Sequence, residues 1–132
     1  MQPEQACCIG RPHIVSVKIK IKEFNESSPF EGKYFTDGNK HCFIFPCEKD
    51  YFKFELSPEG IRVVRKGEHD YEMNLVKGET TRIVMSKPLN GFFSVTTHAM
   101  EVMAHGNAVT ACAEFYLDEE NFRRLEIECE II

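Results

Sequence analysis

The sequence predicts one all-β domain, a single antiparallel up-and-down β-barrel of about eight to ten strands. Three observations lead to this fold. Short segments alternate apolar and polar residues with the period of a strand that buries one face. Turn residues, mainly glycine, proline and asparagine, separate these segments at short intervals. Local hairpins of this kind suit an up-and-down barrel, because closure removes the exposed strand edges that promote aggregation.

The alternation is clearest in the first and last segments. In IVSVKIKIKE, residues 14–23, valine and isoleucine occupy one face while serine and lysine occupy the other. In LEIECEII, residues 125–132, three glutamates face away from leucine, isoleucine and cysteine. If the two strands are neighbours, these glutamates can pair with Lys18, Lys20 and Lys22. Such pairing explains the lysine stripe better than contact with RNA or an acidic partner.

Eight further segments lie between these two strands, and each ends at a turn signal. Only DEENFRR, residues 118–124, looks helical. The segments are FEGKYFT (30–36), KHCFIFPC (40–47), YFKFEL (51–56), IRVVRKG (61–67), DYEMNLV (70–76), TTRIVMSK (80–87), GFFSVTTHAMEVMA (91–104) and AVTACAEFYL (108–117).

Charge and composition restrict the location and the partners. The 21 acidic and 16 basic residues give a formal charge of −5, so we expect no nucleic-acid partner. The N-terminus does not have the pattern of a secretory signal, and no apolar run is long enough to span a bilayer. We therefore expect a cytoplasmic protein with no membrane partner. A flexible tail over 1–13 would precede one barrel domain over 14–132, as a monomer or a homodimer.

The chain carries no motif of an enzyme or a metal site. Its six cysteines would be free thiols in a reducing compartment. Cys42 and Cys47 are the nearest pair with a metal-like spacing, but no second pair follows at ligand spacing. Serine elbows, phosphate loops and metalloprotease helices are missing. We expect no catalytic activity, no metal and no cofactor.

The stretch HAMEVMAH, residues 98–105, has two possible interpretations. In a helix, His98 and His105 would lie two turns apart on one side, which suggests a metal site, although about 10 Å of rise separates them. In a strand they point to opposite faces, about 23 Å apart. The surrounding hairpins favour the strand, and neither geometry lets both histidines bind one ion.

Polar residues that alternate into the predicted interior are the candidate ligand-binding residues. Arg65 shares a face with Ile61 and Val63, and a buried arginine is costly unless an anion pairs with it. Glu101 is the expected partner, although Arg65 could also lie at the rim or bind an anionic ligand through its planar fork. With these two we group Thr97 and Tyr34 as possible ligand contacts.

In the order of its motifs, residues 14–132 resemble a bacterial family of calycin-like, lipocalin-like barrels known as domain of unknown function nineteen-thirty-four. The family's usual tyrosine-glutamate pair is replaced here by Phe45-Pro46-Cys47-Glu48, and one of its tyrosines by Phe115. The resemblance implies the barrel fold and no particular activity. The segments that carry it are the lysine-alternating first strand, Gly32 to Phe35, Ile61 to Gly67, Met73 with Gly78, Pro88 to Gly91, Val95 to Thr97, Phe115 to Leu117 and Leu125 to Ile127.

These observations predict a non-enzymatic binder of a small amphipathic or anionic molecule. The alternative is a barrel filled by its own side chains, which acts as a structural or protein-interaction module. A cavity of several hundred Å³ that Arg65 lines would favour binding. An interior filled by Phe52, Phe54, Phe93 and Phe115 would favour the alternative.

Overall fold

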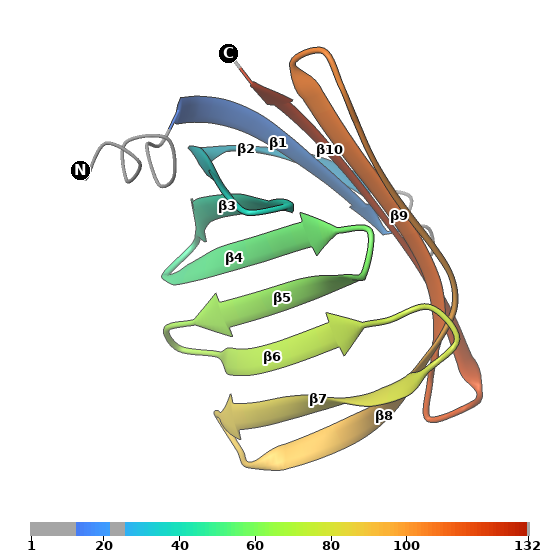
Figure 1. The fold of residues 1–132 in the computed structure, drawn as a ribbon. Coiled ribbons are helices and arrows are strands. Elements are labelled where there is room, and N and C mark those ends of the chain that lie inside the picture. Colours follow the sequence, from blue (N-terminus) through green and yellow to red (C-terminus); the bar gives the residue numbers. More distant parts are fainter. Residues whose placement is uncertain (1–12, 22–25, 132) are drawn as a thin grey trace.

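The computed structural model describes the backbone of residues 13–21 and 26–131 and the side chains of residues 31–130. The described residues form ten strands and no helix (Figure 1). The predicted all-β class is confirmed. The strands are β1 (His13–Ile21), β2 (Glu26–Asp37), β3 (Lys40–Cys47), β4 (Asp50–Ser57), β5 (Gly60–Lys66), β6 (Asp70–Leu75), β7 (Thr80–Lys87), β8 (Gly91–His105), β9 (Ala108–Leu117) and β10 (Asn121–Ile131).

All strand pairs are antiparallel, and each strand from β2 to β9 pairs with its neighbours in sequence. β1 pairs with both β2 and β10, so the order of paired strands returns to its start. Lys18 lies opposite Glu128 and Lys20 opposite Glu126 in this register. The first and last strands are therefore neighbours, which is the condition set for their lysines and glutamates to pair, whereas Lys22 lies outside the described residues.

Two element boundaries differ from the prediction. The helix expected over residues 118–124 is wrong, because Asp118 to Glu120 form a turn and Asn121 begins β10. Asp118 and Glu119 adopt positive φ angles in that turn, a conformation that does not continue into a right-handed helix. At the other end, β1 begins at His13 rather than Ile14, and the remainder of the predicted tail lies outside the described residues.

The core lies on the inner face of the curled sheet, where alternate residues of the strands meet. Large apolar side chains of β3 to β6 and small ones of β9 complement one another there. The buried apolar residues that form this cluster are Tyr34, Phe43, Phe45, Phe54, Leu56, Ile61, Val63, Leu75, Val95, Val109, Ala111, Ala113, Phe115, Leu125, Ile127 and Cys129.

A β-bulge in β8 changes which side chains face the core. Thr97 lies opposite Phe115, but Ala99 lies opposite Glu114, so His98 is an extra residue in the strand. After Thr97, the next side chain of β8 that faces the core is therefore Met100 rather than Ala99. Met100 packs against the core cluster. HAMEVMAH is a strand, as expected, but its alternation is interrupted at its first residue.

Within residues 13–21 and 26–131, no helix is long and apolar enough to cross a membrane. The four cysteines in the part whose side chains are described, Cys42, Cys47, Cys112 and Cys129, are free thiols, as expected. That part also contains no group of three or more histidine, cysteine, aspartate or glutamate side chains that could hold a metal ion.

Candidate functional site: an apolar cavity on the inner face

The inner face encloses a cavity of about 370 Å³ beside the core. Seven strands, β4 to β10, contribute to its wall, which is mostly aromatic and aliphatic. Phe52, Phe54, Phe93 and Phe115 all lie on the wall and leave this volume open between them. The lining residues are Phe52, Phe54, Val63, Tyr71, Met73, Ile83, Met85, Phe93, Phe115, Leu117, Arg123, Arg124 and Leu125.

Solvent reaches the cavity at the β7–β8 side. Phe93 lies opposite Ile83, and both residues line the cavity. Phe93 is nevertheless 44% exposed, whereas Val95, two residues further along the same face, is completely buried. Neighbouring side chains therefore shield the inner face from solvent at Val95 but not at Phe93. Phe93 lies at the mouth of the cavity.

Arg123 places a cation on the wall of this apolar cavity. It lies opposite Phe115 and two residues before the buried Leu125, so it belongs to the inner face. Its Nη1 donates a hydrogen bond to the carbonyl oxygen of Phe122 at 3.2 Å. Neighbouring Arg124 pairs with two carboxylates, and its Nη1 lies 2.6 Å from Glu114 Oε2. Sequence reasoning missed Arg123 because it treated residues 118–124 as helical, although the inward alternation of β10 extends back to it.

Arg65 lies on the apolar face as predicted, but its partner is not Glu101. Its Nε is 2.7 Å from Oδ2 of Asp50, and its guanidinium lies 5.0 Å from the centroid of the Phe52 ring. Arg65 is opposite Phe52 and Tyr71 in the sheet, and those two residues line the cavity whereas Arg65 does not. The guanidinium is therefore already neutralised, and it does not line the cavity.

Glu101 lies on the outer face, which corrects the predicted Arg65–Glu101 pair. After the bulge at His98, Glu101 is opposite Cys112, and its side chain is exposed. It lines a separate outer depression with Cys112 and Glu114. The prediction assumed an uninterrupted alternation from Thr97, and one extra residue was enough to turn Glu101 to the other side.

Tyr34 and Thr97 are both buried, but neither lines the cavity. The Tyr34 hydroxyl lies 2.9 Å from Nδ1 of His41, and its ring stacks on Phe43. Burial raises the pKa of the Tyr34 phenol above its usual value. Thr97 is 1% exposed, and its Oγ1 has no hydrogen-bond partner within the described part of the chain. The four residues chosen from the sequence therefore do not form one site.

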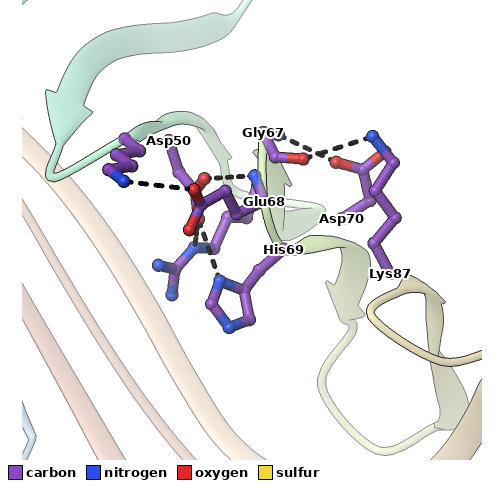
Figure 2. A network of polar contacts seen from close by, with 8 residues as sticks. Asp50, Gly67, Glu68, His69, Asp70 and Lys87 are labelled. Carbon is purple, nitrogen blue, oxygen red and sulfur yellow. Dashed lines mark hydrogen bonds and ion pairs between the residues drawn. The ribbon is translucent and has the colours of Figure 1, made fainter.

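Asp50 is the centre of a polar cluster at the turns that follow β3 and β5. Figure 2 shows its carboxylate beside the backbone of Glu68 and the side chain of His69. It is 2% exposed and accepts hydrogen bonds from Glu68 N at 2.5 Å and Arg65 Nε at 2.7 Å, with His69 Nδ1 at 3.2 Å. Burial alone would raise the pKa of Asp50, but these hydrogen bonds together hold it below its usual value.

Gly67 makes the close approach of the two turns possible. Its φ is 138°, in a region that side-chain-bearing residues rarely adopt, and a Cβ there would lie 2.2 Å from Oδ1 of Asp50. Its amide donates to Oδ1 of Asp70 at 2.8 Å, and its carbonyl accepts from Nζ of Lys87 at 3.3 Å. The cluster thus joins the turns at one end of β3 to β6 and also contacts the end of β7 (Figure 2).

These features describe an antiparallel sheet curled around an apolar cavity that carries an arginine on its wall. Among solved structures, the fold is similar to that of the ywiB protein from Bacillus subtilis, with a TM-score of 0.75 over 97% of this chain and 98% of that chain. The two sequences are 14% identical, so the similarity shows the fold alone. No protein-family model matches the sequence. No curated protein matches it significantly.

Proposed function

We propose that the protein is a non-enzymatic binder of a small amphipathic molecule, held with its apolar part in the cavity and an anionic group near Arg123. In this proposal the curled sheet acts as an up-and-down barrel of calycin type. The observation that carries the proposal is the cavity of about 370 Å³ between β4 and β10 with a guanidinium on its wall.

The size and chemistry of the cavity support a small ligand. Ligand pockets commonly measure about 300–1,000 Å³ and combine apolar walls with a few polar groups. Thirteen residues line this cavity, and apart from Arg123, Arg124 and the Tyr71 hydroxyl their side chains are apolar. A ligand that is mostly apolar would displace water from Phe52, Met73 and Phe115, which is favourable for each apolar surface buried.

The position of Arg123 supports an anionic group on the ligand. The low polarity of the wall strengthens an ion pair formed there, and a guanidinium can donate two parallel hydrogen bonds to a carboxylate, sulfonate or phosphate. Arg65 is less suited to this role because it does not line the cavity. The proposal therefore keeps the ligand class expected from the sequence but assigns its anion to a different arginine.

A matched pair of fluorescent probes tests the proposal. 1-Anilinonaphthalene-8-sulfonate and N-phenyl-1-naphthylamine have the same aromatic skeleton, but only the first carries a sulfonate. Both should bind the folded protein at one saturable site. Arg123→Gln should weaken binding of the sulfonate by about tenfold or more, as expected for loss of a charge-assisted contact, and leave the neutral probe within about twofold.

Two variants control this titration. Arg82→Gln removes a cation from the outer face and should change neither affinity, whereas Ile83→Trp should obstruct the cavity and reduce binding of both probes. If neither probe saturates, or if Ile83→Trp binds both as tightly as the unchanged protein, the cavity does not bind ligands. The alternative of a structural or interaction module would then be preferred.

A further inference from the structure

The β7–β8 hairpin, residues 80–96 where the two strands pair, exposes a concentration of large apolar side chains. Seven large hydrophobic residues are exposed in the part of the chain whose side chains are described, and four of them belong to this hairpin. Leu89 in the turn is 74% exposed, and Phe92 is 58% exposed. Val84 lies opposite Phe92 on the outer face, and Phe93 points to the inner face. The hairpin therefore presents apolar groups on both faces and at its tip.

The charges of this hairpin are opposite in sign to the charge of the whole chain. No aspartate or glutamate occurs from Thr80 to Met100, although the chain carries a formal charge of −5. Arg82 and Lys87 are the cations of this segment, and the Arg82 guanidinium lies 4.4 Å from the centroid of the Phe92 ring. The segment thus combines exposed aromatic surface with positive charge.

The nearest acidic side chains on β6 are already paired. Glu72, opposite Val84, accepts a hydrogen bond from Arg62 Nε at 2.8 Å. Asp70, opposite Lys87, accepts from the Gly67 amide and lies 3.9 Å from Lys66 Nζ. These pairs limit the negative potential on the β6 side of the hairpin. On the β9 side, the Asp118 carboxylate accepts a hydrogen bond from the Ser94 amide at 3.2 Å. The positive charge of the hairpin is therefore available to an anionic surface on the β6 side and at the tip.

We propose that the β7–β8 hairpin docks on the surface of an anionic lipid bilayer, inserting Leu89 and Phe92 between the headgroups while Arg82 and Lys87 contact lipid phosphates. Aromatic and aliphatic side chains flanked by cations have the chemistry of interfacial membrane attachment. Docking does not rest on the proposed ligand binding. The proposal departs from the expectation of no membrane partner, which was based on the lack of a spanning segment.

The hairpin that we propose to dock on the bilayer also carries Phe93, a residue of the cavity mouth. Phe93, at the cavity mouth, directly follows Phe92 in the same strand but points to the opposite face, so a bilayer that receives Phe92 is separated from the mouth by this strand. A second copy of the chain fits this surface less well. In a two-fold dimer the same patch meets itself, which would bring Arg82 and Lys87 close to their own copies without acidic residues of the segment between them.

Sedimentation with lipid vesicles tests this proposal. The protein should bind vesicles of phosphatidylcholine mixed with phosphatidylglycerol and bind pure phosphatidylcholine vesicles much less. Added salt should weaken binding because it screens the contribution of the two cations. The double variant Leu89→Ser/Phe92→Ser should bind the mixed vesicles at least about tenfold less, and Arg82→Gln/Lys87→Gln should lose the preference for phosphatidylglycerol.

The matched control is Tyr51→Ser/Met103→Ser, which removes two exposed apolar side chains from strands β4 and β8 outside the hairpin and should bind like the unchanged protein. Circular dichroism verifies that each variant is folded. Equal binding by Leu89→Ser/Phe92→Ser and the unchanged protein would overturn the proposal. So would a concentration-dependent dimer, detected by ultracentrifugation and lost in this variant, if vesicles are not bound. Ile83→Trp should keep vesicle binding, which distinguishes a failure of docking from a failure of ligand binding.

Discussion

Two regions of the sheet carry several phenylalanines and use them to opposite effect. In β3 and β4, Phe43 and Phe45 are completely buried, and Phe45 stacks between Phe52 and Phe54 at centroid distances of 5.5 Å. In the β7–β8 hairpin, Phe92 and Phe93 are among the most exposed large side chains of the described residues. The same residue type therefore supports a packed core in one region and an open, apolar surface in the other.

Phe45 and Phe93 both face inward, but only Phe45 is shielded from water by neighbouring side chains. This shielding, rather than the direction of the side chain, separates the two regions. Phe45 packs against two further rings, Phe52 and Phe54 of β4, and the three rings exclude water from one another. Around Phe93, the wall surrounds an open cavity. We infer that β3 to β6 supply stability, while β7 and β8 are available for contact with other molecules.

The largest expected effect compares truncations in the two regions. Phe45→Ala should lower the free energy of unfolding by about 3–5 kcal/mol, because it removes a buried ring and leaves a cavity. Phe93→Ala should cost less than about 1 kcal/mol, because its ring is already partly in water. Urea denaturation followed by circular dichroism measures both. Equal losses would mean that the hairpin contributes as much to stability as the packed region, and the comparison would fail.

A second comparison concerns the carboxylate that supports the packed region. Because hydrogen bonds hold the folded-state pKa of Asp50 below its usual 3.8, the stability it contributes is present above that unfolded value. This contribution is lost as the pH falls through the lower, folded-state value. Asp50→Asn should therefore be less stable than the unchanged protein at neutral pH. The difference between the two should shrink as the pH falls below the usual value of 3.8.

Unfolding free energies measured across that pH range test the sign of the effect. Glu101→Gln is a suitable control, since its side chain is exposed on the outer face and should leave the pH profile unchanged. The difference in unfolding free energy between Asp50→Asn and the unchanged protein could instead stay constant through the acidic range. Asp50 would then stabilise the fold through packing and hydrogen bonding rather than through its negative charge.

The sequence predicted the strands well because period-two alternation and turn residues are local signals. The neighbouring positions of β1 and β10 could also be inferred, since lysines and glutamates alternate in complementary registers. The polar site was harder to predict because it depends on which residues meet across turns. Asp50 and Arg65 lie fifteen positions apart, and no periodicity connects them.

Two particular residues explain the errors in the candidate site. His98, the extra residue of the bulge, reversed the faces of the residues after it and so turned Glu101 outward. Arg123 was concealed by a polar stretch that has helix-like composition but whose second half belongs to a strand. The open cavity could not be predicted at all, because alternation identifies the inner side chains without showing whether they fill the space between the strands.

The smallest expected effect separates the buried charge from the exposed charges beside it. Lys49 Nζ and Glu68 Oε2 are 3.6 Å apart, next to the Asp50 cluster, and both side chains are largely in solvent. Lys49→Ala should change the free energy of unfolding by less than about 0.5 kcal/mol, because water and salt screen such a pair. Urea denaturation at low and high salt measures the change. A loss comparable to that of Asp50→Asn would mean that the two turns act as one coupled network, in which the exposed lysine helps to hold the Glu68 amide against the buried carboxylate.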